Sequence, residues 1–275
     1  MARYKLTLEY AGTRYSGWQI QQNARTVQGE LHRALGDVSK GGLIETYGAG
    51  RTDAGVHALG QVAHADFRVE LPPATLLARA NEALPHDINV LHAERVPARF
   101  HARHSAVARS YLYQISRRRT AFAKPFVWWI REPLDVDAMR RASDHLLGLG
   151  DFRAFTDDDP EEKSTRVLVQ QVAVEPAGDL ILVRVVGSHF LWRMVRRLVG
   201  VLAAVGRKDL PAGDVPRLLT SSSDVPARLT APASGLFLER VFYEDPPLDL
   251  KIEPAMFGRT EVTPPSTSPT YRTGR

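Results

Sequence analysis

The chain begins with strict alternation of apolar and polar residues. Every second position is apolar in this stretch, at Tyr4, Leu6, Leu8 and Tyr10. A period of two is that of a β-strand with one buried face. Further strands are predicted at 43–48, 60–69 and 88–96. Two amphipathic helices separate them, the first capped by Thr26 and the second opened by Pro72-Pro73. The predicted order is β-α-β-β-α-β, the ferredoxin-like split unit of RNA-recognition domains.

The second half of the chain repeats this order of elements. Its predicted strands span 108–116, 166–174, 180–186 and 235–243. Its predicted helices span 136–146, after Asp135 as cap, and 190–205, with a short addition near 214–220. Residues 180–186 are almost wholly apolar, so we expect this strand to be central and covered on both faces. We therefore predict an α+β fold of two ferredoxin-like, RRM-like βαββαβ halves, with a largely antiparallel extended sheet and a central basic cleft.

Two segments fall outside this pattern. Residues 157–162 include five acidic side chains. We expect an exposed, solvated loop there, because nothing spaces the oxygens around a turn as a metal site requires. From Pro246 onward the chain is rich in proline, serine and threonine, which is typical of a tail that is flexible or draped on the surface. The expected units are an N-terminal domain at 1–104, a C-terminal domain at 105–246 and a tail at 247–275.

Composition narrows the class of protein. The 275 residues are 44% hydrophobic and 24% charged, which is ordinary for a globular protein with a substantial core. No apolar run reaches the length of a membrane span, so we expect no membrane-spanning helix. The start of the chain shows no secretory signal, so we expect no signal peptide. The chain contains no cysteine, which excludes disulfides and thiolate chemistry. A cytoplasmic location is expected.

The charge points to a nucleic-acid partner. The net charge is +5 and the isoelectric point is near 9.6. Only six of the 36 basic residues are lysines, and arginine both binds phosphate in a bidentate manner and stacks on bases. Because a GC-rich genome also enriches arginine, the local clusters carry more weight than the total. These clusters lie at 99–109, 117–119 and 193–197.

A glycine-bracketed loop between two predicted strands is the strongest candidate for chemistry. It runs from Gly48 to His57 and holds Asp53 two residues after Arg51. Glycine lets a backbone approach a ligand closely, and loops supported by a sheet often present catalytic side chains. The strand that follows alternates apolar and polar residues, so we expect it to be half-buried. An ordinary hairpin with an Asx-type turn at Asp53 is the alternative.

Two other segments carry residues suited to binding or chemistry. Tyr111 and Tyr113 lie on one face of a predicted strand, where exposed rings stack on unpaired bases and buried rings belong to the core. The predicted helix at 190–205 has an apolar face with arginines along its margin, at Arg193, Arg196 and Arg197. An arginine beside so apolar a surface is expected to have an anionic partner, because an unpaired buried charge is costly.

Taken together, these three segments resemble the tRNA pseudouridine synthase A family. The catalytic motif of that family is similar to Gly50 through Ala58, with Gly60-Gln61-Val62 following. Its tyrosine motif resembles residues 109–113. Its third motif resembles Phe190-Leu191 through Met194-Val195-Arg196, with Val199-Gly200. The resemblance spans roughly residues 4–243, and the acidic loop and the tail depart from it.

The resemblance implies an isomerase that converts uridine to pseudouridine. The N1–C1′ bond breaks and the ring rejoins the sugar through C5. Asp53 is implied to attack C1′ or C6 as a nucleophile, or to remove the 2′ proton, and the sequence leaves these routes open. Arg196 is implied to keep Asp53 ionised, Tyr111 to stack on the target ring, and Arg51 to extrude the nucleotide or take its place. No redox change occurs, so neither cofactor nor metal is expected, and His101 and His104 are interpreted as surface residues.

The implied partner is tRNA, modified on the 3′ side of the anticodon stem-loop at nucleotide positions 38–40, by a homodimer. Substrate-binding residues are expected to be Tyr111, Phe190, Leu191, Arg14, Arg25, Arg103 and Arg109. The cluster at 117–119 is a further candidate for phosphate contacts, and affinity should then fall steeply with salt.

Two other classes of function remain as alternatives. A non-catalytic protein with tandem RNA-recognition folds explains the charge and the repeat, but not a carboxylate within a cationic cleft. A glycosidase generally needs two carboxylates at a defined separation, and no second one recurs near Asp53.

Overall fold

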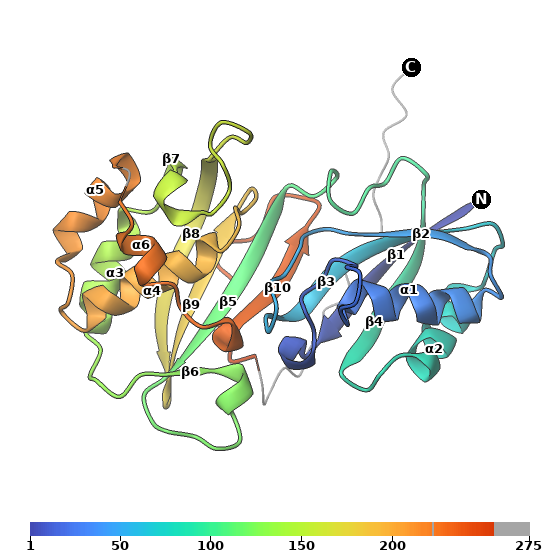
Figure 1. Cartoon of the computed structure of the whole chain (residues 1–275), viewed down its shortest axis with the longest axis horizontal. Helices are drawn as coiled ribbons and strands as arrows, with labels where there is room; N and C mark the ends of the chain where they lie inside the picture. The colour runs from blue at the N-terminus through green and yellow to red at the C-terminus, as the bar shows by residue number, and fades with distance from the viewer. Residues whose placement is uncertain (222, 256–275) are drawn as a thin grey trace.

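One extended sheet runs through the molecule (Figure 1). The computed structural model describes residues 1–221 and 223–255. The strands are β1 (Ala2–Tyr10), β2 (Leu43–Gly48), β3 (His57–Phe67), β4 (Ile88–Val96), β5 (Ala108–Ser116), β6 (Trp128–Trp129), β7 (Gly148–Asp151), β8 (Arg166–Ala177), β9 (Leu180–Gly187) and β10 (Leu236–Phe242). They pair in the order β4-β1-β3-β10-β5-β9-β8-β7, with β2 also paired to β3 and β6 to β5.

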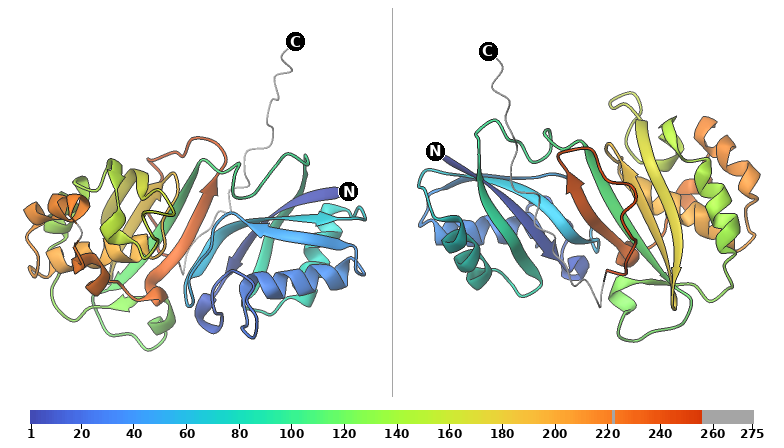
Figure 2. Two further views of the ribbon diagram at one scale, coloured as in Figure 1. Left: turned by 45° about the horizontal axis from the view of Figure 1, so that its top comes forward. Right: turned by 180° about the vertical axis from the view of Figure 1, so that it is seen from behind.

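The helices gather at the two ends of this sheet (Figures 1 and 2). The α-helices are α1 (Val27–Val38), α2 (Pro73–Ala83), α3 (Val136–Asp144), α4 (Met194–Gly206), α5 (Val215–Thr220) and α6 (Val225–Arg228). Single 3₁₀ turns occur at Gly12–Arg14, Lys124–Phe126, Arg153–Phe155, Ala212–Asp214 and Ala233–Gly235. No helix in the described part of the chain is long and apolar enough to cross a membrane.

The predicted mixed fold with a large, mostly antiparallel, open sheet is confirmed. Most neighbouring strands run antiparallel, and the exceptions described are β10 with β3 and β5 with β6. The parallel contact of β10 with β3 joins Phe237 to His57 and Leu238 to Ala58, next to the Asp53 loop. The N-terminal strands and the C-terminal strands therefore meet where the strongest chemical motif lies.

Local sequence signals account for most element boundaries. Thr26 caps α1 by accepting a hydrogen bond from the Gly29 amide, and Asp135 caps α3 through the Ala138 amide. The alternation in β1 buries its even-numbered residues, from Ala2 to Tyr10, and leaves the intervening residues half-exposed. One continuous hydrophobic cluster joins α1, α2 and α4 to the sheet, which makes a shared core.

The prediction that β3 is half-buried was wrong, because this strand is buried on both faces. Asp66 is 1% exposed and paired with Arg3 from β1, and His57 packs between Phe126 and Phe237. These covering groups come from distant parts of the chain. Alternation along one strand reports nothing about them.

The helix predicted from Phe190 begins later than expected, at Met194. Arg193 has φ +61 and ψ 2, which places it in the left-handed region and prevents the helix from extending backward. Residues 188–193 therefore form a loop that leads into α4. This correction moves Phe190 and Leu191 from a helix face to a loop wall.

Two regions outside the predicted pattern have a defined place. The acidic loop is not simply solvated, because Asp157 forms ion pairs with Arg197 and Arg193. The described part of the tail, 247–255, lies on the sheet: Ile252 and Ala255 pack against a small apolar cluster. The expected tail at 256–275 lies outside the described residues.

Candidate active site

The Asp53 loop is held by hydrogen bonds to three of its backbone carbonyls. The Trp18 amide donates to the Thr52 carbonyl at 3.0 Å, and the Gln61 side chain donates to the Gly50 carbonyl at 2.9 Å. Within the loop, the Val56 amide donates to the Asp53 carbonyl at 3.1 Å. This closed turn requires Gly55, whose φ of +79 is rarely adopted by other residues. The loop is thus a shaped support for Asp53 and not a free hairpin end.

Asp53 lies opposite Arg196, which comes from α4. A carboxylate oxygen of Asp53 (Oδ2) and a terminal guanidinium nitrogen of Arg196 are 3.4 Å apart. The Arg196 Nε donates to the Ala231 carbonyl at 2.7 Å, and the Ala231 amide donates back to the Arg196 carbonyl at 3.0 Å. One turn later, a Cβ on Gly200 would lie 1.7 Å from the Leu229 carbonyl oxygen. The glycine in this motif therefore lets the 229–231 segment approach α4 and anchor the arginine.

The two tyrosines of β5 have different environments. Tyr111 is 9% exposed, lines the cavity beside Asp53 and meets the Phe190 ring edge-on, with 5.1 Å between ring centroids. Burial raises the pKa of Tyr111 to about 12, an effect that nearby Arg109 opposes and Asp53 reinforces. Tyr113 is fully buried and donates its hydroxyl to the Pro232 carbonyl at 2.8 Å. Only the first of these rings is available to a bound base.

A cavity of about 800 Å³ opens between the N-terminal and C-terminal strands. Of the sequence-predicted residues, it is lined by Arg51, Asp53, Arg103, Arg109, Tyr111, Phe190, Leu191 and Arg196. Basic side chains dominate its charged lining, since Arg193 and Lys163 join the predicted arginines around Asp53 and Asp158. The cavity is therefore suited to a substrate that carries negative charge and a flat ring.

The predicted arginines hold different positions around the cavity. Arg51 is exposed and donates to the Gln19 side-chain oxygen at 3.1 Å. Arg109 is 9% exposed and donates to four backbone carbonyls, among them Ala49 at the start of the Asp53 loop. Its guanidinium therefore ties β5 to that loop.

Other predicted basic residues lie away from the cavity lining. Arg14 and Arg25 do not line it, and Arg25 pairs with Glu30 while its guanidinium covers the Tyr15 ring. Arg117 and Arg118 also lie elsewhere: they follow β5 and contact Gly178 and Asp179 on the turn that joins β8 and β9. These residues are placed to meet a substrate only if it extends beyond the cavity.

The residues that line the cavity and that sequence reasoning missed include Asp158, Lys163 and Trp192. The Asp158 carboxylate accepts from the Trp192 amide at 2.9 Å and from the Lys163 ammonium at 2.7 Å. Burial opposes ionisation of Asp158, but these hydrogen bonds outweigh it and hold its pKa below the usual range. The sequence did contain one signal for this contact, namely the opposite charges of the acidic loop and the 193–197 cluster.

The interpretation of His101 and His104 as surface residues holds for His104, which is exposed, whereas His101 is half-buried. The rings of Tyr47, His64, His101 and His104 pack together, with centroid separations of 4.3–5.6 Å. Within residues 1–221 and 223–255, no group of three or more histidine, aspartate or glutamate side chains is placed to hold a metal ion.

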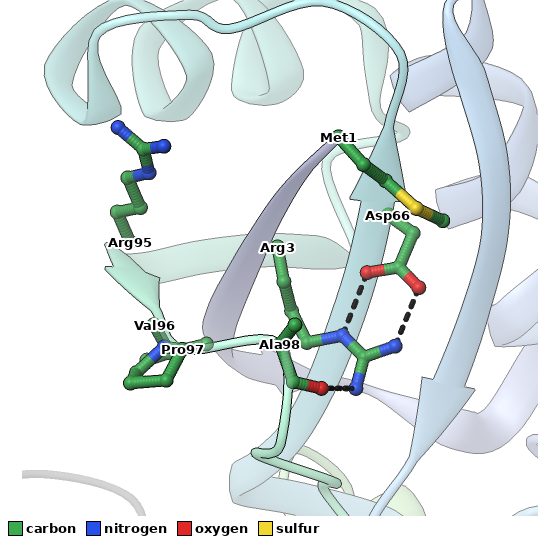
Figure 3. Close-up of a pocket in the computed structure, with 7 residues that line it drawn as sticks. All are labelled: Met1, Arg3, Asp66, Arg95, Val96, Pro97 and Ala98. Atoms are coloured by element: carbon green, nitrogen blue, oxygen red, sulfur yellow. Dashed lines mark hydrogen bonds and ion pairs between the residues drawn. The ribbon is translucent and has the colours of Figure 1, made fainter.

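A second cavity, of about 410 Å³, lies at the ends of β1, β3 and β4 (Figure 3). Its charged groups are already paired: Arg3 binds both carboxylate oxygens of Asp66 and also donates to the Ala98 and Phe100 carbonyls. The Arg3 hydrogen bond, opposed by burial, lowers the pKa of Asp66. This cavity lacks the half-open carboxylate that distinguishes the Asp53 site.

The chain matches the tRNA pseudouridine synthase family over residues 7–105 and 142–244. It belongs to this family, and it is an isomerase that acts on tRNA.

Relatives cover most of the chain. A tRNA pseudouridine synthase A from Rhodopseudomonas palustris (strain BisA53) is 43% identical over 247 residues, which are 89% of this chain and 100% of the relative. One from Myxococcus xanthus is 43% identical over 250 residues, 90% of this chain and 94% of the relative. A solved structure of a Cbf5-Nop10-Gar1 complex aligns at 12% identity and a TM-score of 0.31, over 72% of this chain and 54% of that one, and carries no argument.

Proposed function

We propose that this enzyme forms pseudouridine on the 3′ side of the anticodon stem-loop, at the three consecutive positions named above. The observation that carries the proposal is the placement of Asp53 against Arg196 in a basic cavity that also presents the Tyr111 ring. The carboxylate comes from the loop between β2 and β3, and the guanidinium comes from α4. A single anion among cations suits a reaction at the C1′ of a nucleotide whose phosphates need neutralisation.

In the proposed reaction, Asp53 acts directly on the nucleotide. It attacks C1′ and is displaced when C5 bonds there, or it adds to C6 and is eliminated after the new bond forms, or it removes the 2′ proton and returns it when C5 bonds to C1′. The N1–C1′ bond breaks, the ring turns, and a C5–C1′ bond forms. The C5 proton is then lost and N1 carries a proton, so the product is an isomer of the substrate. All exchanged bonds lie within one nucleotide, and no metal or cofactor is part of the proposal.

The remaining residues have supporting roles in this proposal. Arg196 pairs with Asp53 and offsets its negative charge in the cavity. Tyr111 and Phe190 contact the target ring, and Leu191 completes the apolar wall. Arg51 helps to extrude the nucleotide, which costs only a few kcal/mol where pairing is weak. Arg103 contacts phosphate from within the cavity, and Arg14 and Arg25 do so outside it. Arg109 holds the loop in place.

The architecture and the assembly belong to the same proposal. The strands of residues 1–104 follow the order β4-β1-β3-β2, and the long strands of residues 105–246 follow β10-β5-β9-β8, with the short β7 beyond β8 and the short β6 beside β5. The same order in both supports two ferredoxin-like units, which we treat as the two domains. The family resemblance supports a homodimer, and a tRNA substrate supports a cytoplasmic location.

The test is incubation of the enzyme with unmodified tRNA transcripts, followed by position-resolved detection of pseudouridine. The proposal expects product at the three adjacent uridines and nowhere else. Product confined to another arm of tRNA would overturn the assigned position. Absence of product on every transcript would overturn the activity itself.

A further inference from the structure

An exposed tryptophan lies at the mouth of the catalytic cavity. Trp192 is 49% exposed and lines the cavity between Leu191 and Arg193. Ligand cavities are lined mainly by apolar and aromatic side chains, so an exposed indole in this lining is a candidate for ligand contact. The neighbouring lining is largely basic, so a partner for this indole must combine an apolar face with negative charge.

The indole is fixed in place by its backbone. The Trp192 amide donates to an Asp158 carboxylate oxygen at 2.9 Å. The next residue, Arg193, has the left-handed conformation that non-glycine residues seldom adopt. An ion pair of 3.1 Å between Arg193 and Asp157 holds that residue in the turn. The acidic loop therefore contacts this turn through both Asp157 and Asp158.

The side chains support the same arrangement. The Arg193 guanidinium lies over the indole, with its central carbon 4.9 Å from the ring centroid. Asp157 also pairs with Arg197, which is 4% exposed and is further held by the Ala154 and Thr156 carbonyls. A preorganised aromatic ring loses little entropy when a ligand stacks on it.

Nucleotide extrusion creates a need for such a ring. When a target nucleotide leaves its stack to enter an active site, the adjacent base loses a stacking partner. An aromatic side chain replaces that partner irrespective of sequence, because every base has a π-face. A ring for this purpose must lie at the mouth of the cavity, outside the position of the target uridine. Trp192 meets this requirement, whereas Tyr111 lies inside.

We propose that Trp192 stacks on the nucleobase next to the target uridine, with Asp157 and Asp158 as positioning residues for the turn that presents it. This inference rests on the proposed tRNA substrate. It adds a binding position for a second nucleotide, and it assigns the acidic loop a role in substrate recognition that is structural and not ionic.

The test measures affinity for an anticodon stem-loop RNA in an Asp53→Asn background, so that the RNA stays unmodified. Trp192→Ala is expected to weaken binding at least about fivefold, which is the lower limit for removal of one base–aromatic stack. Trp192→Phe should retain most of the affinity. The matched control is Trp129→Ala: Trp129 is 43% exposed and has Arg119 over its ring, but it does not line the cavity.

A second RNA makes the test specific for stacking. Abasic nucleotides replace the bases on both sides of the target uridine. Trp192→Ala should then cause less than a twofold further loss, because the base that it stacks on is already missing. Equal weakening on intact and abasic RNA would overturn the proposal, as would no weakening on intact RNA, an equal effect of Trp129→Ala, or a change of oligomeric state on Trp192→Ala.

The same RNA is incubated in parallel with wild-type enzyme. Failure to form pseudouridine there contradicts the proposed function. The binding measurements do not depend on turnover, so they report separately on the stacking of Trp192.

Discussion

One arginine–carboxylate pair lies inside the sheet and another lies in the cavity. They differ in how many hydrogen bonds their side chains make and in how exposed those side chains are. Arg184 on β9 makes two hydrogen bonds to Glu239 on β10, at 2.8 and 2.7 Å, and both side chains are 7% exposed. Ser110 donates to the same carboxylate at 2.7 Å, and Arg184 also donates to the Leu250 carbonyl. This network ties three strands to the segment that follows β10.

The pair in the cavity is looser. Asp53 and Arg196 have one contact of 3.4 Å, and their side chains are 28% and 18% exposed. A buried ion pair that makes several hydrogen bonds stabilises the fold only while both side chains are present. A single contact between half-exposed side chains leaves the carboxylate oxygens accessible to a substrate. The first pair is built to hold the fold, and the second is the one to which the proposed function assigns chemistry.

The largest expected effect is on the pair inside the sheet. Glu239→Ala should lower the free energy of unfolding by about 3–5 kcal/mol, because it leaves the Arg184 charge buried without this carboxylate. Urea denaturation measures the change. Asp224→Ala is the control, since its pair with Arg228 is exposed and should contribute about 0.2–1 kcal/mol. Similar losses in both variants would contradict the distinction.

The pair in the cavity should show the opposite balance. Arg196→Met is expected to lower turnover by about 100- to 1000-fold, as for loss of one electrostatic contact in an active site. Its cost in stability should be only about 1–2 kcal/mol, between the values for exposed and buried pairs. Single-turnover rates and urea denaturation measure the two effects. A variant with normal turnover but several kcal/mol less stability would make this pair structural as well.

Much of the fold can be predicted from local patterns in the sequence, but the pairing of charged side chains in the interior cannot. β1, β4 and β5 were predicted within one residue of their observed ends, because each has an alternating or continuous apolar signal. β6 and β7 have two and four residues and are too short for periodicity to reveal. The Arg184–Glu239 pair joins residues 55 positions apart, and only the folded sheet brings them together.

The site was predictable only in part, and for a related reason. Arg196 and Asp53 are 143 positions apart, so their pairing came from family resemblance and not from spacing. The turn at Arg193 depends on contacts with Asp157, which no helical period encodes. Trp192 was missed because an apolar residue in an apolar segment carries no signal for exposure.

The interior is expected to accept a charged side chain only when a partner neutralises that charge. The pH dependence of stability caused by the buried His64 tests this expectation. Burial lowers the pKa of His64 from 6.5 to about 4, and the positive charges of Arg3 and His101 add to this effect. The unfolded chain therefore binds a proton near pH 6.5 that the folded chain refuses until about pH 4. Stability should fall over this interval as the pH falls, by roughly 3 kcal/mol.

The matching variant is His64→Asn, which keeps an acceptor near the position of the His64 Nδ1 that binds the Ala102 amide. Urea denaturation at pH 7 and pH 4.5 should show a smaller difference for this variant than for wild type. An unchanged difference would assign the loss of stability to other groups.

The smallest expected effect concerns the cavity ring. Tyr111→Phe keeps the ring that stacks and removes a hydroxyl that stays protonated at neutral pH, since its pKa is raised to about 12. Turnover should fall less than about tenfold, within the limit of a lost hydrogen bond. Tyr113→Phe is the control: it loses the bond to Pro232, so stability and not turnover should change. Complete loss of turnover in Tyr111→Phe would give the hydroxyl a chemical role.

The central claim is that the Asp53 carboxylate acts on the nucleotide while the rest of the cavity binds it. The most direct measurement is the single-turnover rate and tRNA affinity of Asp53→Asn. The rate of pseudouridine formation should fall at least about 1000-fold, as when an enzyme loses a group that acts on the reacting bond, and affinity should stay within about twofold because the basic lining is intact. Retained turnover with lost affinity would contradict the claim.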